Sequence, residues 1–184
     1  GKVTVNFGEP IYLNDVLAVH APDWRSDRDN SEGKLPWMSD LVDDLAQRIN
    51  VNINRAADVN PINLLALTLL STPKHAMDEE DLRAQIGLSK RLLAGEPYGP
   101  RMTMTGMDAP AIIAYGEEMG VILRTKHPLG DVISMDPETA VLQSYYRNNI
   151  LHLYSAAAWI ALSFQNNRRM SRSSLIRLRS EERR

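Results

Sequence analysis

Four histidines are the side chains of this sequence that could act as a general base near neutral pH: His20, His75, His127 and His152. Only His75 has a carboxylate five positions further on, Glu80, as a base oriented by an acid would require. Glu80, however, belongs to the acidic run 78–81, which is typical of the first turn of a helix. No oxyanion-stabilising group accompanies this pair, and the sequence offers no obvious partner for His20 or His127. We therefore predict no catalytic site in this chain.

The residue inventory limits other chemistries. The 184 residues include no cysteine, which excludes disulfides, thiolate nucleophiles, zinc–thiolate sites and iron–sulfur clusters. We also find no glycine-rich phosphate loop, nucleophile elbow, metal-ligand cluster or signal peptide. Hydrophobic residues make up 43% and charged residues 24% of the chain, as in a folded domain with a packed core. We therefore predict a folded chain without a metal or a cofactor.

Charge is distributed unevenly along the chain. From Arg168 onward seven arginines stand against Glu181 and Glu182, while the rest of the chain is acidic. An acidic body argues against nucleic-acid binding, because neutralising phosphates requires a basic surface. We interpret residues 168–184 as a basic, truncated helical tail with a solvated end. Contact with anionic lipid headgroups or an acidic partner is the alternative.

The first segment has the pattern of a β-strand. Residues 2–7 alternate in polarity, and Gly8-Glu9-Pro10 ends the run. Because a lone strand is not stable, we expect its sheet to come from chain upstream of Gly1. Residues 22–36 are polar and contain Pro22, Gly33 and Pro36, so we predict a surface loop. We therefore assign residues 1–36 to the terminal strand and connector of a preceding domain.

Helical periodicity dominates residues 37–167, which we predict to be a helical C-terminal domain of a mainly α (α+β) fold. Apolar residues recur every three to four positions from Trp37. Asparagine or aspartate followed by proline starts helices at 60–61 and 136–137, and aspartates start two more at 78 and 108. The turn at 127–130 between two apolar runs predicts a β-hairpin.

Residues 61–135 follow the order of a winged-helix unit, with three helices and then a two-stranded wing. The third helix of such a unit would read DNA. Here it carries Asp108, Glu117 and Glu118 and no basic residue, so it would repel phosphate. We therefore predict a structural module that does not bind nucleic acid.

Residues 150–164 form the most apolar run of the chain. This run is shorter than the ~20 residues that span a bilayer, and it contains His152, Ser155 and Ser163. We therefore predict a buried core helix. An interfacial helix, with Trp159 and the arginine tail at lipid headgroups, is the alternative.

A polar cluster at helical spacing surrounds the start of this run: Tyr145, Arg147, Asn148, Asn149 and His152. Because buried polar groups must find partners, the cluster either forms an internal hydrogen-bond network or contacts another domain. We predict that it serves stability and domain docking rather than a chemical step.

Three segments resemble the bacterial glycerol-3-phosphate 1-O-acyltransferases of the inner membrane. They are residues 5–10 (Val-Asn-Phe-Gly-Glu-Pro), residues 20–25 (His-Ala-Pro-Asp-Trp-Arg) and residues 140–152, which include Tyr-Tyr-Arg-Asn-Asn at 145–149. The resemblance extends over essentially the whole chain, and it corresponds to the region after that family's acyltransferase blocks. The family's His-x-x-x-x-Asp block is missing, because the residues five positions after the four histidines are Arg25, Glu80, Val132 and Ala157.

The resemblance implies an activity for the full-length protein. It would transfer an acyl group from acyl-CoA or acyl-carrier protein to the sn-1 hydroxyl of glycerol 3-phosphate, giving lysophosphatidate at the cytoplasmic face of the inner membrane. The implied partners are the upstream acyltransferase domain, acyl-carrier protein and an anionic membrane surface, with no further cofactor. For this chain the resemblance implies a non-catalytic structural and docking region without a transmembrane helix. A non-enzymatic winged-helix or membrane-surface module is the alternative.

Overall fold

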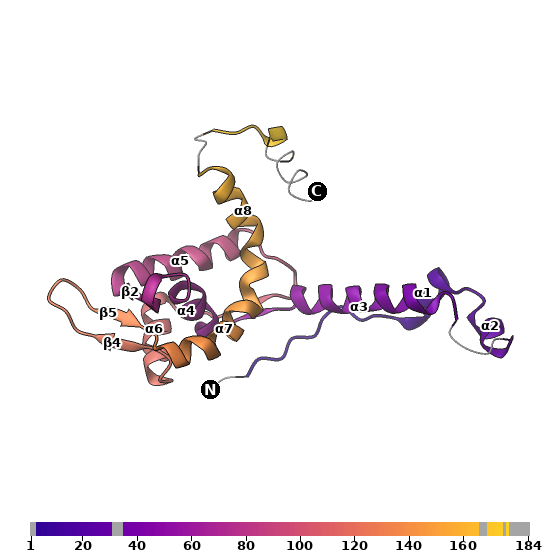
Figure 1. The fold of residues 1–184 in the computed structure, drawn as a ribbon, viewed down its shortest axis with the longest axis horizontal. Helices are drawn as coiled ribbons and strands as arrows, with labels where there is room; N and C mark the ends of the chain where they lie inside the picture. Colours follow the sequence, from indigo (N-terminus) through magenta and orange to yellow (C-terminus); the bar gives the residue numbers. More distant parts are fainter. Residues whose placement is uncertain (1–2, 31–34, 166–168, 175, 177–184) are drawn as a thin grey trace. The chain divides into compact units, whose positions relative to one another are not determined.

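The computed structural model describes residues 3–30, 35–165, 169–174 and 176. Most of the predicted basic tail, residues 168–184, lies outside this part. The chain divides into two compact units, drawn as ribbons in Figure 1. The N-terminal unit comprises Lys2–Asp58 and Gly99–Thr103, and the C-terminal unit comprises Val59–Tyr98 and the chain from Met104 onward. Most of the described chain is helical, with a few short strands, which confirms the predicted mainly α (α+β) class.

Helix α4 (Pro61–Leu69) is the central element of the C-terminal unit. The Asn60 side chain accepts a hydrogen bond from the backbone N–H of Asn63, and the Asn63 side chain accepts one from the N–H of Asn60. This reciprocal cap and the proline at the first helical position explain why the helix begins here. Its leucines Leu64, Leu65 and Leu69 are fully buried.

Helices α5 (Glu79–Gly95) and α6 (Ala109–Glu118) both pack against α4. Their caps are Asp78 and Asp108, whose side chains accept hydrogen bonds from backbone N–H groups of the first turn. Gly116 permits the close approach of α6 to α4, because a Cβ at this position would lie 2.5 Å from Cδ1 of Leu65.

A three-stranded antiparallel sheet completes this unit, in the order β2 (Ala76–Asp78), β5 (Val132–Ser134) and β4 (Leu123–Thr125). The β4–β5 hairpin occurs where the sequence predicted it. Strand β2, which pairs with β5, was not predicted because three residues show no period-two pattern. The element order is the one expected of a winged-helix unit.

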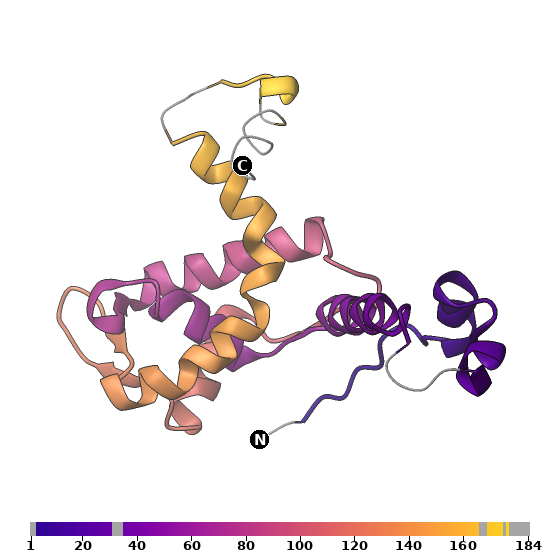
Figure 2. The ribbon, with the colours of Figure 1, turned by 45° about the vertical axis from the view of Figure 1, so that its right-hand side comes forward.

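Helix α7 (Pro137–Leu151) begins at the capping residue Asp136 and packs along α4. A 3₁₀ turn, η2 (His152–Tyr154), joins it to α8 (Ser155–Ser163), which extends away from the other helices of this unit in both views (Figure 1, Figure 2). Leu153 and Tyr154 are buried, but no α8 residue is buried within the described chain. The predicted core helix over 150–164 is therefore wrong after Tyr154, because no described element covers α8.

The N-terminal unit contains α1 (Leu13–His20), α2 (Trp24–Asn30) and α3 (Met38–Arg55). Its core is small: Val16, Leu17 and Leu41 are buried, and Ile11, Trp24 and Trp37 pack against them. Helix α2 corrects the predicted loop over 22–36 at residues 24–30, while residues 31–34 lie outside the described part of the chain. Trp24 gives this polar segment a packing contact that its composition did not reveal.

No strand forms within the described residues 3–10. The strand at the start of the chain stays a prediction, because its sheet is expected from chain outside these 184 residues. Side chains hold this segment instead of a neighbouring strand. Asn6 Nδ2 donates to the carbonyl oxygen of Ala56 at 2.9 Å, and Asn52 Nδ2 donates to that of Glu9 at 2.9 Å. A strand would need a ladder of backbone partners. Elsewhere, β1 (Asp58–Val59) pairs with β3 (Thr103–Met104).

Candidate docking site on helix α7

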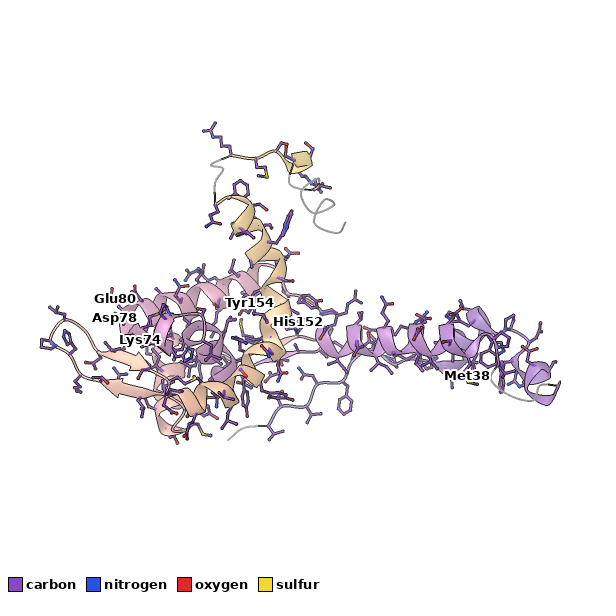
Figure 3. All side chains as sticks on the ribbon, in the orientation of Figure 1. Met38, Lys74, Asp78, Glu80, His152 and Tyr154 are labelled. Atoms are coloured by element: carbon purple, nitrogen blue, oxygen red, sulfur yellow. The ribbon has the colours of Figure 1, made fainter. Side chains whose placement is uncertain are left out.

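The His75 region does not form a base–acid pair. Lys74 and His75 have positive φ angles of 61° and 50° in the turn η1 (Pro73–His75) between α4 and β2. The His75 carbonyl accepts a hydrogen bond from the N–H of Met135 at 2.9 Å, and its buried Nδ1 has no hydrogen-bond partner among the described residues. Glu80 is the second residue of α5, and its N–H donates to Oδ1 of the capping residue Asp78 at 2.8 Å (Figure 3). Both residues therefore serve the turn and the helix start.

The structure shows a partner for His20 that the sequence did not reveal. His20 Nε2 lies 2.9 Å from Oδ2 of Asp44, and Arg48 Nε donates to Oδ1 of Asp44 at 3.0 Å. The hydrogen bonds from Arg48 and His20 lower the pKa of the Asp44 carboxyl below its usual range. Both oxygens of Asp44 are thus engaged, and the trio links α1 to α3.

An open cleft of about 500 Å³ lies beside this trio in the N-terminal unit. Its charged lining is mixed, with acidic and basic side chains together: Glu9, Asp15, Asp44, Arg48 and Arg55. Glu9 is also 3.5 Å from Arg101. Such a lining selects no single charge class of ligand, so the cleft does not identify a substrate.

His127 and His152 make local contacts. His127 Nδ1 accepts a hydrogen bond from the N–H of Leu129 at 3.2 Å within the hairpin turn. His152 packs edge-to-face on Tyr98, with 5.0 Å between ring centroids. Beside it, the Tyr154 hydroxyl donates to the carbonyl oxygen of Ser89 at 3.4 Å, and burial raises the pKa of Tyr154 (Figure 3). His152 therefore belongs to the packed turn between α7 and α8.

The other members of the predicted polar cluster lie toward the surface of α7. Tyr145 is 69% exposed, and Asn148 and Asn149 are exposed as well. The half-buried Arg147 donates from Nε and Nη2 to Oδ1 of Asn148, at 3.2 and 3.1 Å. The structure thus separates His152 from the exposed members, and no internal hydrogen-bond network joins all five within the described chain.

Exposed apolar side chains extend this surface toward the start of α7. Val141 and Leu142 are 73% and 70% exposed, and they precede Tyr145 at the three- and four-residue spacing of one helix face. We call Val141, Leu142, Tyr145, Asn148 and Asn149 the α7 face. Contiguous exposed apolar and aromatic side chains mark interaction surfaces. The arrangement therefore suits docking of a protein surface.

The buried side of α7 carries polar groups that sequence reasoning missed. Asn63 Nδ2 donates to the backbone carbonyl oxygen of Tyr146 at 2.7 Å. Gln143 is buried, and its Oε1 has no hydrogen-bond partner in the described chain. The sequence pattern around Asn60 could have revealed that Asn63 takes part in a helix cap. It could not have revealed the hydrogen bond from Asn63 to Tyr146, because these two residues are 83 positions apart.

The described part of the chain also bears on metal binding and membrane crossing. There, no group of three or more histidine, aspartate and glutamate side chains is placed to hold a metal ion. Among the same residues, no helix combines the length and the apolar character needed to cross a membrane.

Comparison with known proteins identifies the family. The family model for the glycerol-3-phosphate acyltransferase C-terminal region matches residues 1–181. The glycerol-3-phosphate acyltransferase of Xanthomonas campestris pv. campestris is 59% identical over 178 residues, which is 97% of this chain and 20% of that protein. The same-named proteins of Xylella fastidiosa and Pseudomonas fluorescens are 57% and 40% identical, over 97% and 96% of this chain and 21% of each relative. The chain spans about a fifth of the length of these curated relatives. The resemblance seen in the sequence is confirmed: this chain belongs to the glycerol-3-phosphate acyltransferase C-terminal region family.

Proposed function

We propose that this chain is the non-catalytic C-terminal region of a glycerol-3-phosphate acyltransferase and that it docks on the upstream acyltransferase domain through the α7 face. The observation that carries this proposal is the exposure of Val141, Leu142 and Tyr145 on one side of a helix whose other side is packed. Fully burying an apolar side chain of this size stabilises by about 1.5–3 kcal/mol. Covering the α7 face would therefore favour association.

The activity proposed for the whole protein follows the names of its relatives, each a glycerol-3-phosphate acyltransferase. In this proposal the full-length enzyme acylates the sn-1 hydroxyl of glycerol 3-phosphate from acyl-CoA or acyl-carrier protein, without another cofactor. Acyl transfer requires a base, an acid that orients it and groups that stabilise the developing oxyanion. In the described chain Asp44 pairs with His20 but is also held by Arg48, and Glu80 lies in the first turn of α5, where its N–H donates to the capping residue Asp78. These contacts support placing the chemical step in another domain.

A second candidate role is contact with an anionic membrane surface at the cytoplasmic face of the inner membrane. Helix α8 supports it, because none of its residues is buried in the described chain and Leu162 is well exposed. The sequence after it is rich in arginine, which is attracted to anionic headgroups. Nucleic acid is not proposed, since the exposed side of α6 carries Glu118 and no cation.

Substitutions on the α7 face of the full-length enzyme test the docking. Val141→Asp and Tyr145→Asp should lower both its melting temperature and its acyltransferase activity, while leaving unfolding of the 184-residue chain unchanged. Leu88→Asp is the matched control, because Leu88 is also an exposed apolar residue on a helix of this unit. Equal effects of all three substitutions in the full-length enzyme would contradict docking through α7.

Flotation of the 184-residue chain with vesicles tests the membrane role. Vesicles with anionic lipid should carry the chain upward and neutral vesicles should not, with the charge effect weakened by salt. Flotation that does not depend on lipid charge would count against this role.

A further inference from the structure

Helix α3 has three different faces. One face contacts the rest of the N-terminal unit: Leu41 lies in its core, Asp44 holds His20, and Asn52 holds the carbonyl oxygen of Glu9. A second face is polar and consists of Asp43, Gln47, Asn50 and Asn54. The third face is apolar, and it begins near Met38 at the start of the helix (Figure 3).

The apolar face is a regular row of exposed side chains. Val42, Ile49 and Ile53 are 52%, 44% and 62% exposed, and Ala46 between them is exposed as well. We call these four residues the α3 seam. Their spacing of four, three and four positions is the spacing of the apolar a and d positions along which two helices pack. A narrow row of this kind fits one partner helix.

The N-terminal unit does not cover the seam itself. At about 100° per residue, the seam points roughly 130° away from the face that holds Leu41, Asp44 and Asn52. This unit buries only Val16, Leu17 and Leu41 in its cluster, which is a small core for its length. Units of below about 70–80 residues rarely gain enough stability from one core without additional support. The seam is a regular, exposed apolar surface on α3 from which such support can come.

We propose that the α3 seam is the docking surface for one α-helix from the part of the full-length enzyme that lies outside these 184 residues. The spacing of the seam specifies a helix, and the small side chain of Ala46 at its centre lets the two backbones approach. The relatives are about five times as long as this chain, so most of the protein that can supply the helix lies elsewhere. The polar face with Gln47 and Asn50 stays in water, which limits the contact to one helix pair.

This inference rests on the proposed function only in treating the chain as part of a longer acyltransferase. It does not use the α7 face, which belongs to the other unit. The two docking surfaces can therefore be tested separately in one protein.

Cysteine accessibility in the full-length enzyme tests the seam. The chain contains no cysteine, so Ile49→Cys, Ile53→Cys and the control Asn50→Cys each place a single reporter in this region. Maleimide labelling is followed by mass spectrometry of the peptide that carries the reporter. Ile49→Cys and Ile53→Cys should label about tenfold more slowly than Asn50→Cys in the full-length enzyme. In the 184-residue chain all three should label at similar rates.

A photo-crosslinker in place of Ile49 identifies the occupant, and a crosslinked peptide from outside this region would support the proposal. Equal labelling of Ile49→Cys and Asn50→Cys in the full-length enzyme would overturn it. If the seam cysteines of the 184-residue chain label more slowly as the chain concentration rises, a second copy of the chain covers the seam. If they label more slowly only when vesicles are present, lipid covers it. Either result also overturns the proposal.

Tyr145→Cys in the same assay reports on the α7 face. Fast labelling of Tyr145→Cys together with slow labelling of the seam cysteines would contradict the proposed α7 docking and leave the seam proposal standing.

Discussion

Arg124 Nε donates a hydrogen bond to Oε1 of Glu117 at 2.7 Å, and this bond fastens strand β4 to helix α6. The same guanidinium binds Asp131 at 3.0 Å and also contacts Glu79 at the start of α5. Hydrogen bonds from Glu117, Glu79 and Asp131 raise the pKa of Arg124 above its usual range, so it stays charged. One cation therefore holds three carboxylates from three segments of the C-terminal unit.

Replacing Arg124 with leucine removes the cation and leaves these carboxylates close together. We expect Arg124→Leu to lower the free energy of unfolding by about 1–3 kcal/mol, measured by urea denaturation of this chain. Arg83→Leu is the control, because Arg83 also binds Glu79 but from an exposed i,i+4 position. That pair should contribute only about 0.3–0.5 kcal/mol. Equal losses in the two variants would show that the network adds no stability of its own.

The same network predicts how stability depends on pH. Hydrogen bonds from Arg124 lower the pKa values of Glu79 and Asp131 below their usual 4.5 and 3.8. The folded chain thus binds these protons less readily than the unfolded chain. The two ionised carboxylates therefore stabilise the fold. This stabilisation is complete above their usual pKa values, and it is lost as the pH falls through their lowered pKa values in the folded chain. Urea unfolding between about pH 5 and pH 3 should show this loss, with a shallower slope for Arg124→Leu. An identical slope in the variant would contradict the assignment.

The purified 184-residue chain should not catalyse acyl transfer. Incubation with acyl-CoA and glycerol 3-phosphate should give no lysophosphatidate above background, because the described residues around its histidines include no base–acid pair with an oxyanion site. In the full-length enzyme, His75→Ala should keep kcat/KM within about twofold. Turnover by the isolated chain would refute the assignment of chemistry to another domain.

The exposure of Asn149 predicts different effects in the isolated chain and in the full-length enzyme. Asn149→Ala should change the unfolding free energy of the 184-residue chain by less than about 0.5 kcal/mol, because an exposed side chain makes few contacts that the substitution could remove. In the full-length enzyme it should lower the melting temperature if the α7 face is a docking surface. A full-length variant with unchanged stability and substrate affinity but kcat reduced by roughly several hundred-fold would point instead to a transition-state role.

Much of the C-terminal unit could be predicted because its signals are local. Asn60 and Asp136, each followed by proline, supply cap and first helical residue within a few positions, and helices α4 and α7 begin there. The hairpin turn at 127–130 is equally local. The polar residues Tyr145, Asn148 and Asn149 could be found from their spacing alone. The segments 5–10, 20–25 and 140–152 together were also enough to indicate the family.

Only the tertiary structure decided which of these surfaces are covered. His20 and Asp44 meet across 24 positions, so spacing along the chain carried no sign of their pairing. Residues 155–163 are as apolar as a core helix, yet none is buried in the described chain, because burial depends on which elements lie opposite. The alternating residues 3–7 form no strand in the described chain for the same reason, because a strand requires a ladder of backbone partners from another segment. Single side-chain hydrogen bonds hold this segment instead: Asn6 donates to the carbonyl oxygen of Ala56, and Asn52 donates to that of Glu9.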